Sequence, residues 1–232
     1  MLGIVKKGGR HRMRCYAEDY CKKDKSECNE YCGGYRVLKA LYSLSRIPVK
    51  YQYNIPLTPS KDDLPKYEEL HEFMCNILDH VEAGDGLYIW SGGTGNGKTT
   101  WATKIMGYYF RKIAFDSGLE NEGLYIYLPT FLENLRQYYS NPDPDFEEVI
   151  EMVSRCKLLI IDDIGAEKPS EWVTERLLSF INTRVTNGLS TIYTSNIPLD
   201  AVGHRMGDRV RSRITGSVKE INLTGKDRRA KL

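Results

Sequence analysis

Apolar residues along this chain of 232 residues follow two patterns: short continuous runs and longer stretches with a helical period. Continuous runs are typical of parallel strands buried on both faces, and apolar residues three and four positions apart are typical of amphipathic helices. The runs predict strands at residues 87–90, 124–128, 157–163, 191–196 and 218–223. The periodic stretches predict helices at residues 35–44, 67–81, 100–106, 131–139, 145–155 and 170–185. This alternation indicates an α/β fold with a mostly parallel sheet.

Four prolines between residues 48 and 66 indicate an extended linker and a domain boundary. We therefore divide the chain into a Cys-rich module at residues 1–47, a Pro-rich linker at residues 48–66 and a larger α/β domain at residues 67–232. The predicted helix at residues 35–44 is basic on one face. It either docks a partner protein or packs within the module.

The stretch from Gly92 to Thr99 fits the phosphate-binding pattern Gly-x-x-x-x-Gly-Lys-Ser/Thr and lies between a predicted strand and a predicted helix. Its glycines allow successive N–H groups to face a triphosphate, and the helix N-terminus adds a partial positive charge. Lys98 would reach the β- and γ-phosphates of ATP, and the hydroxyl of Thr99 would bind Mg²⁺. A Gly-rich turn with an incidental lysine is the alternative. The residues expected to bind the nucleotide are Gly93, Thr94, Gly95, Asn96, Gly97, Lys98, Thr99 and Thr100.

The predicted strand at residues 157–163 ends in two carboxylates, Asp162 and Asp163. In open parallel sheets, ligands bind at the edge formed by the carboxyl ends of the strands. A magnesium-binding acid is therefore expected here. The strand at residues 191–196 ends in the polar pair Ser195 and Asn196 at the same edge.

Four cysteines, Cys15, Cys21, Cys28 and Cys32, fall within eighteen positions, with His11 just upstream. Without a secretion signal, clustered cysteines favour a metal over disulfides. Four thiolates can bind tetrahedral Zn²⁺, which would supply much of the folding energy of so small a module. The gaps of five, six and three residues differ from paired Cys-x-x-Cys knuckles. An iron–sulfur cluster and free thiols therefore stay open as alternatives to zinc.

The charge distribution separates the ends of the chain from its middle. Residues 1–50 hold 12 Lys and Arg against 5 Asp and Glu, residues 200–232 hold 9 against 4, and residues 51–199 hold 12 against 22. Basic ends on an acidic body fit contacts with nucleic acid or an acidic subunit, or simply a solubilising surface. No apolar run approaches a membrane span and the first residues lack the apolar core of a signal peptide, so we expect a cytoplasmic protein with no membrane partner.

The run from Leu158 to Trp172, together with Thr194-Ser195-Asn196, resembles the AAA+ ATPases, specifically the DnaC/IstB-like group of replicative-helicase loaders. The resemblance covers residues 67–232. It implies a AAA+ P-loop NTPase core with a five-stranded parallel sheet flanked by helices. It also implies that the C-terminal helical lid of most AAA+ proteins is missing.

The resemblance implies roles for several residues. Asp162 matches the Walker B acid that holds Mg²⁺, largely through water. Asp163 takes the place of the catalytic Glu that orients and deprotonates the attacking water, and its shorter side chain implies slow intrinsic turnover. Asn196 matches sensor 1, which holds that water or the γ-phosphate. Arg229 is in register with the sensor 2 arginine.

Residues 207–214 resemble box VII, in which an arginine points at the ATP of the next subunit and makes hydrolysis depend on assembly. Arg213 is the first choice for this finger and Arg209 the second, although both could lie on the solvated face of a short helix. In the loaders, the helix after the second strand faces the channel of a spiral oligomer. Here that helix offers Arg136, Tyr138 and Tyr139 to single-stranded DNA, unless the tyrosines pack against the core.

The resemblance as a whole implies an ATP-dependent loader of a hexameric replicative DNA helicase onto single-stranded DNA, which hydrolyses ATP in an oligomer of its own chain. The Cys-rich module would bind the helicase. One alternative is an IstB-like transposition helper that assembles on duplex DNA and recruits a transposase. Another is an adaptor that binds ATP without hydrolysing it, against which the intact set Lys98, Asp162, Asp163 and Asn196 argues.

Overall fold

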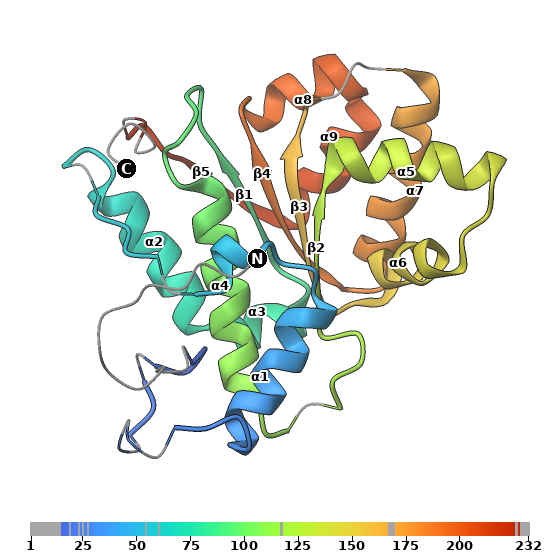
Figure 1. Ribbon diagram of the computed structural model, residues 1–232. Helices are drawn as coiled ribbons and strands as arrows, with labels where there is room; N and C mark the ends of the chain where they lie inside the picture. The colour runs from blue at the N-terminus through green and yellow to red at the C-terminus, as the bar shows by residue number, and fades with distance from the viewer. Residues whose placement is uncertain are drawn as a thin grey trace.

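The computed structural model describes residues 15–225 and Asp227, except residues 19, 23, 25, 27, 54, 60, 117 and 167–169. Within these residues, five strands form one parallel sheet in the order β2-β3-β4-β1-β5 (Figure 1). The strands are β1 Gly86–Trp90, β2 Gly123–Tyr127, β3 Leu158–Ile164, β4 Ser190–Ser195 and β5 Val218–Asn222. The parallel α/β sheet predicted from the apolar runs is confirmed.

Helices cover both faces of the sheet, which gives three layers (Figure 1). Alternate strand residues face opposite layers, so Leu87 and Ile89 point into one hydrophobic core and Tyr88 into the other. The first layer contains α1 Gly33–Leu44, the 3-10 turn η2 Val49–Tyr51, α2 Leu64–Cys75, α3 Ile77–Ala83 and α4 Lys98–Ile113. The second contains α5 Leu128–Ser140, α6 Pro144–Arg155, α7 Glu171–Thr186, α8 Leu199–Met206 and α9 Asp208–Thr215.

Two helical segments differ from the expectation. The single helix predicted over residues 67–81 is wrong, because Asn76 leaves helical geometry (φ −100°, ψ 22°) and separates α2 from α3. The apolar stripe continues across this break, which is why periodicity alone missed it. Helix α8 was not predicted, since it has only eight residues and therefore too few apolar positions to show a helical period.

Helix α1 packs against the sheet domain and contributes Leu38, Leu41 and Tyr42 to the core that it shares with α4. Gly107 of α4 leaves room for the Tyr42 hydroxyl, which a Cβ at that position would overlap. The helix therefore packs on the sheet domain rather than within the Cys-rich module alone, and its role in docking a partner stays a prediction. The domain boundary at residue 47 stays a prediction.

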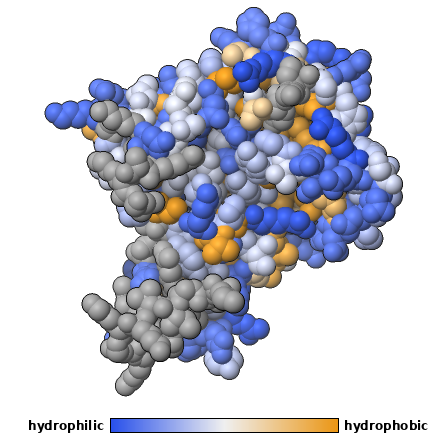
Figure 2. Space-filling model, turned by 45° about the horizontal axis from the view of Figure 1, so that its top comes forward, coloured by the Kyte–Doolittle hydropathy of each residue, from blue (hydrophilic) through white to orange (hydrophobic). Residues whose placement is uncertain are grey.

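The face shown in Figure 2 is mainly hydrophilic, with small separate apolar patches between polar groups. In the part of the chain that the structure describes, no helix is both long and apolar enough to cross a membrane.

Candidate functional site

The loop that joins β1 to α4 holds the predicted phosphate-binding residues. Gly95 and Gly97 have φ values of +70° and +100°, a region that side chains other than glycine's rarely adopt. Lys98 begins α4 and folds back over the loop, because its Nζ donates to Gly93 O at 2.9 Å and to Asn96 Oδ1 at 3.1 Å. The ammonium group is thus held inside the loop, at the positive end of a 16-residue helix.

The carboxylate of Asp162 receives three hydrogen bonds. Its Oδ1 accepts from Thr99 Oγ1 at 2.8 Å and from Thr194 Oγ1 at 2.5 Å. Its Oδ2 accepts from Tyr125 Oη at 2.7 Å. Only 6% of Asp162 is exposed. A buried carboxylate therefore lies directly against the hydroxyl group that the sequence assigned to a magnesium ion.

A β-bulge turns the next residue, Asp163, toward the same edge of the sheet. The pairing of β3 with β4 shifts register between Ile161 and Ile164, and Asp163 has a φ of +66°. Successive strand residues normally point to opposite faces, and a bulge re-aims one of them. As a result, Asp163 Oδ1 accepts from Asn196 Nδ2 at 2.7 Å, and Tyr127 Oη lies 3.4 Å from Oδ2.

The strand order explains why these groups meet. β3, β4 and β1 are neighbours, and all of them run in the same direction. Their carboxyl ends therefore bring the loop before α4, the two acids and Asn196 to one edge. Sequence reasoning missed Tyr125, Tyr127 and Thr194, which read as ordinary strand residues. Only the register of the sheet shows that their hydroxyls reach the acids.

The C-terminal segment reaches the same loop through Asp227. Thr94 Oγ1 donates to Asp227 Oδ2 at 3.2 Å, and a Cβ at Gly95 would overlap the Asp227 carboxylate. Arg229, predicted as sensor 2, lies outside the described residues, as does His11.

The predicted arginine fingers lie on α9, which packs on the face of the sheet opposite to α4 (Figure 1). Arg209 and Arg213 are exposed and line a groove between α7 and α9. Among the described residues, neither guanidinium group makes a hydrogen bond or an ion pair. Arg211 differs, because it pairs with Asp200 at 3.1 Å and with Asp208 at 3.6 Å.

The three residues predicted to contact DNA belong to an aromatic cluster on α5 and α7. The Arg136 guanidinium lies 4.9 Å from the centre of the Trp172 ring, and the Tyr139 ring meets the same indole edge-on at 6.3 Å. Arg176 Nη1 donates to Tyr139 Oη at 3.3 Å. Tyr138 contacts the Phe146 ring and is half-buried, whereas Tyr139 is 56% exposed. Trp172 and Arg176 were not predicted as part of this surface.

The four clustered cysteines are all free thiols, and two of them, Cys21 and Cys28, are exposed. Burial raises the pKa of Cys15, the Ala17 N–H lowers it, and the thiolate charges of Cys28, Cys32 and Cys21 would raise it further. Within the described ranges, however, no three His, Cys, Asp or Glu side chains are arranged to hold a metal ion. The zinc site predicted from the sequence is not confirmed.

A parallel sheet in this order, with the glycine-rich loop between β1 and α4 and two acids ending β3, has the fold of AAA+ P-loop proteins. The chain is 25% identical over 254 residues to the replicative helicase loader DnaI of Bacillus subtilis, an alignment that covers 90% of this chain and 78% of DnaI. No family model matches the chain.

Two solved structures show the same fold. The crystal structure of the DnaC helicase loader has a TM-score of 0.64 and 22% identity, and the match covers 76% of this chain and all of that one. The replication initiator DnaA bound to AMPPCP and single-stranded DNA has a TM-score of 0.55 and 19% identity, over 75% of this chain and 50% of that one. The AAA+ fold and the similarity to DnaC-type loaders that the sequence indicated are confirmed.

Proposed function

We propose that this protein is an ATP-dependent loader that places a hexameric replicative DNA helicase on single-stranded DNA during replication in the cytoplasm. The similarity to DnaI carries this proposal. Because the alignment covers 90% of this chain, it cannot be confined to the AAA+ domain proposed at residues 67–232. It therefore includes part of the N-terminal region through which we propose that the helicase is bound.

The loop before α4 is suited to bind ATP. Lys98 now donates to two neutral oxygens within the loop, and phosphate oxygens would be stronger acceptors for its ammonium group. Thr99 and Asp162, already joined at 2.8 Å, form a hard oxygen donor set that fits Mg²⁺. Bound Mg²⁺ would neutralise charge that develops on the β- and γ-phosphates.

Asp163 and Asn196 supply the remaining chemistry of hydrolysis. The Asn196 amide donates to Asp163 Oδ1 at 2.7 Å and so fixes the plane of that carboxylate. We assign Asp163 to orient the attacking water and to take its proton while the bond between the γ-phosphorus and the bridging oxygen breaks. Phosphate release from ATP tests this assignment, and a protein that binds ATP without releasing phosphate would be the adaptor instead.

Hydrolysis is proposed to depend on self-association, with Arg213, or failing that Arg209, reaching the ATP of a neighbouring subunit. Both side chains are exposed and free to do so, whereas Arg211 is held by two aspartates. Arg213→Ala should abolish DNA-stimulated hydrolysis and leave ATP binding intact. Arg211→Ala is the matched control on the same helix. Unchanged turnover in Arg213→Ala would remove it as the finger.

Single-stranded DNA is proposed to bind the cluster of Arg136, Tyr138 and Tyr139. An exposed tyrosine beside arginines can stack on a base, while the cations contact phosphate without reading sequence. We expect weak binding of an oligo-dT probe at low salt with a non-hydrolysable ATP analogue, lost in Tyr139→Ala. Phe115→Ala, which removes another exposed ring, should bind normally. No affinity of the unmodified protein would refute the proposal.

We propose that zinc brings Cys15, Cys21, Cys28 and Cys32, which cluster in the sequence, into one site. Metal analysis of protein purified without a His tag should then find about one equivalent. Cys21→Ser should lose the metal, whereas Cys75→Ser, on α2, should keep it. Less than about half an equivalent of zinc and no cluster absorbance would leave free thiols as the answer.

The loading function is tested by the mass of the assembly formed with the hexameric replicative helicase of the same source and ATP. Several copies per hexamer are expected. A shortened chain that begins at residue 33 should lose the complex, provided that its thermal melting shows it folded. The cut stops there because α1 belongs to the core. ATP-dependent filaments on duplex DNA, with no helicase complex, would instead favour the transposition helper.

A further inference from the structure

Tyr125, in the middle of β2, is the residue outside the predicted site that contacts it most directly. We propose that Tyr125 is a positioning residue, whose hydroxyl holds the Asp162 carboxylate in the orientation required to bind Mg²⁺. This inference rests on the nucleotide site proposed above. Tyr125 itself touches neither nucleotide nor metal in this assignment and acts through Asp162.

The argument begins with how the two oxygens of Asp162 are shared. Oδ1 accepts from Thr99 and Thr194, and Oδ2 accepts from Tyr125 at 2.7 Å. The hydroxyl of Thr99 would bind the metal and would then no longer be available to Asp162. Asp162 then keeps one donor on each oxygen, Thr194 on Oδ1 and Tyr125 on Oδ2. A carboxylate held at both oxygens cannot rotate, whereas one held at Oδ1 alone can.

Tyr125 is a donor at neutral pH. Its phenol hydroxyl carries the proton of this hydrogen bond, because an ionised carboxylate can only accept. Only 8% of the residue is exposed, so water competes little for this bond.

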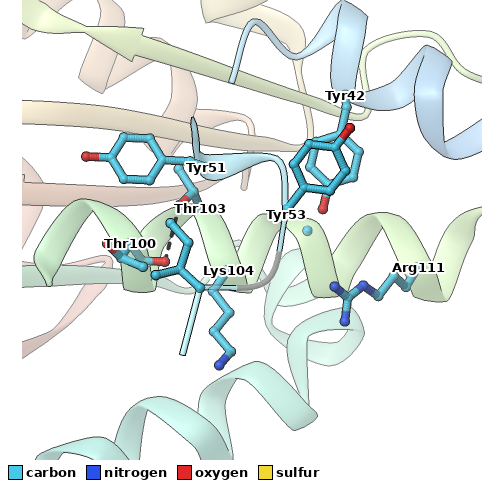
Figure 3. Close-up of a pocket in the computed structure, with 9 residues that line it drawn as sticks. Tyr42, Tyr51, Tyr53, Thr100, Thr103, Lys104 and Arg111 are labelled. Atoms are coloured by element: carbon cyan, nitrogen blue, oxygen red, sulfur yellow. Dashed lines mark hydrogen bonds between the residues drawn. The ribbon is translucent and has the colours of Figure 1, made fainter. Parts of the chain in front are cut away.

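The backbone of Tyr125 is fixed by the N-terminal part of the chain. β2 is an edge strand, and the Tyr125 N–H donates to Ser45 O, just after α1, at 2.8 Å. Tyr51 of η2 packs against the hydrophobic core that contains Tyr125. Figure 3 shows Tyr51 beside Thr100 and Thr103 of α4. The hydrogen bond to Ser45 thus fixes the backbone of Tyr125, which favours the rigidity that a positioning role needs.

A buried tyrosine can also donate to a carboxylate for stability alone, and this chain contains such a pair. Tyr109 Oη, on α4, donates to Glu122 Oε2 at 2.7 Å, and both residues are buried. Glu122 precedes β2 and lies at the opposite end of that strand from the acids. Tyr109→Phe and Tyr125→Phe therefore remove the same kind of bond and keep both rings. Only the second change touches Asp162.

The experiment measures the affinity of a fluorescent ATP analogue in EDTA and across a Mg²⁺ titration. Groups that orient metal ligands typically contribute 10–100-fold to metal affinity, so Tyr125→Phe should raise the half-saturating Mg²⁺ concentration about tenfold or more. Its affinity for the analogue in EDTA should not change. Tyr109→Phe should match the unmodified protein in both conditions.

A second measurement is the rise in melting temperature produced by ATP with Mg²⁺ and by ATP with EDTA, which also shows whether each variant is folded. Tyr125→Phe should lose part of the Mg²⁺-dependent rise, and Tyr109→Phe should keep all of it. Identical Mg²⁺ dependence in the three proteins would overturn the role of Tyr125. If Mg²⁺ does not change the affinity of the unmodified protein for the analogue, the proposed Mg²⁺-dependent nucleotide site is wrong. The role proposed for Tyr125 is then wrong as well.

Discussion

Replacing Arg184 with methionine should destabilise the protein severely. Methionine preserves much of the apolar stem and removes the guanidinium group. Only 1% of Arg184 is exposed. The oxygens that accept its hydrogen bonds are Thr191 Oγ1 at 2.8 Å, Val153 O at 2.9 Å, Cys156 O at 2.9 Å and Ser190 O at 2.5 Å, and Cys156 Sγ accepts a weaker one at 3.5 Å. The group thus fastens the ends of α6 and α7 to the start of β4.

The magnitude follows from what is left behind. A buried acceptor that loses its donor costs about 1–3 kcal/mol, and four oxygen acceptors lose theirs here. The full sum is not reached, because methionine no longer pays for burying a charge and the oxygens relax toward other donors. Breaking a buried network of this kind typically costs about 3–5 kcal/mol. For a chain of this size that corresponds to a fall in Tm of roughly 6–20 °C.

Thermal and urea unfolding, followed by circular dichroism, measure this loss. The stability of Arg184→Lys should lie between that of Arg184→Met and that of the unmodified protein, since one ammonium group cannot reproduce the planar set of donors of a guanidinium group. Arg155→Met, which removes an exposed ion pair to Glu151, should melt like the unmodified protein. A loss below about 1 kcal/mol for Arg184→Met would refute the reasoning, because the four oxygens would then have found other donors at little cost.

Three further changes probe other contacts. Asn196→Ala removes a hydrogen bond to the Asp163 carboxylate worth about 1.5–3 kcal/mol, so phosphate release should fall about 10- to 100-fold with ATP affinity unchanged; an equal loss of both would contradict the assignment. Gly107→Ala should lower the unfolding free energy by about 1–3 kcal/mol because its Cβ meets the Tyr42 hydroxyl. In a Tyr42→Phe background the same change should become neutral or stabilising, and a cost that persists there would exclude the overlap as its cause. Hydrogen bonds from two lysines hold the pKa of Glu69 below its usual value, so its stabilising effect is present at neutral pH and is lost as the pH falls through that lowered pKa. The Tm difference between Glu69→Gln and the unmodified protein should therefore disappear in acid, and a difference independent of pH would disprove the linkage.

The sequence predicted those parts of the site whose residues follow one another along the chain. The loop from Gly92 to Thr99 combines a spacing of glycines with a lysine and a threonine, and its flanking strand and helix follow from apolar periodicity. Asp162 and Asp163 end an apolar run, which predicts that they lie at the edge of the sheet. In each case the chemistry depends on neighbours along the chain, which a sequence shows directly.

The parts that were missed depend on contacts between distant segments. Tyr125 reads as one more buried residue of a strand, and its bond to Asp162 exists only because β2 and β3 pair in one particular register. The same holds for Trp172, which meets α5 from the start of α7. The cysteines show the opposite case, because their spacing in the sequence suggests a metal, whereas no group of three such ligands is assembled among the residues that the structure describes.

The bond from Tyr125 to Ser45 has a consequence for how this chain avoids self-aggregation. β2 ends the sheet, and an unpaired strand edge is a template on which another chain can add a strand. The segment after α1 covers the middle of that edge, because the Tyr125 N–H donates to Ser45 O at 2.8 Å. Removal of α1 and the segment after it would therefore leave the edge of β2 unpaired and expose part of the hydrophobic core. We therefore expect a chain without α1 and the segment after it to self-associate more readily than the full chain.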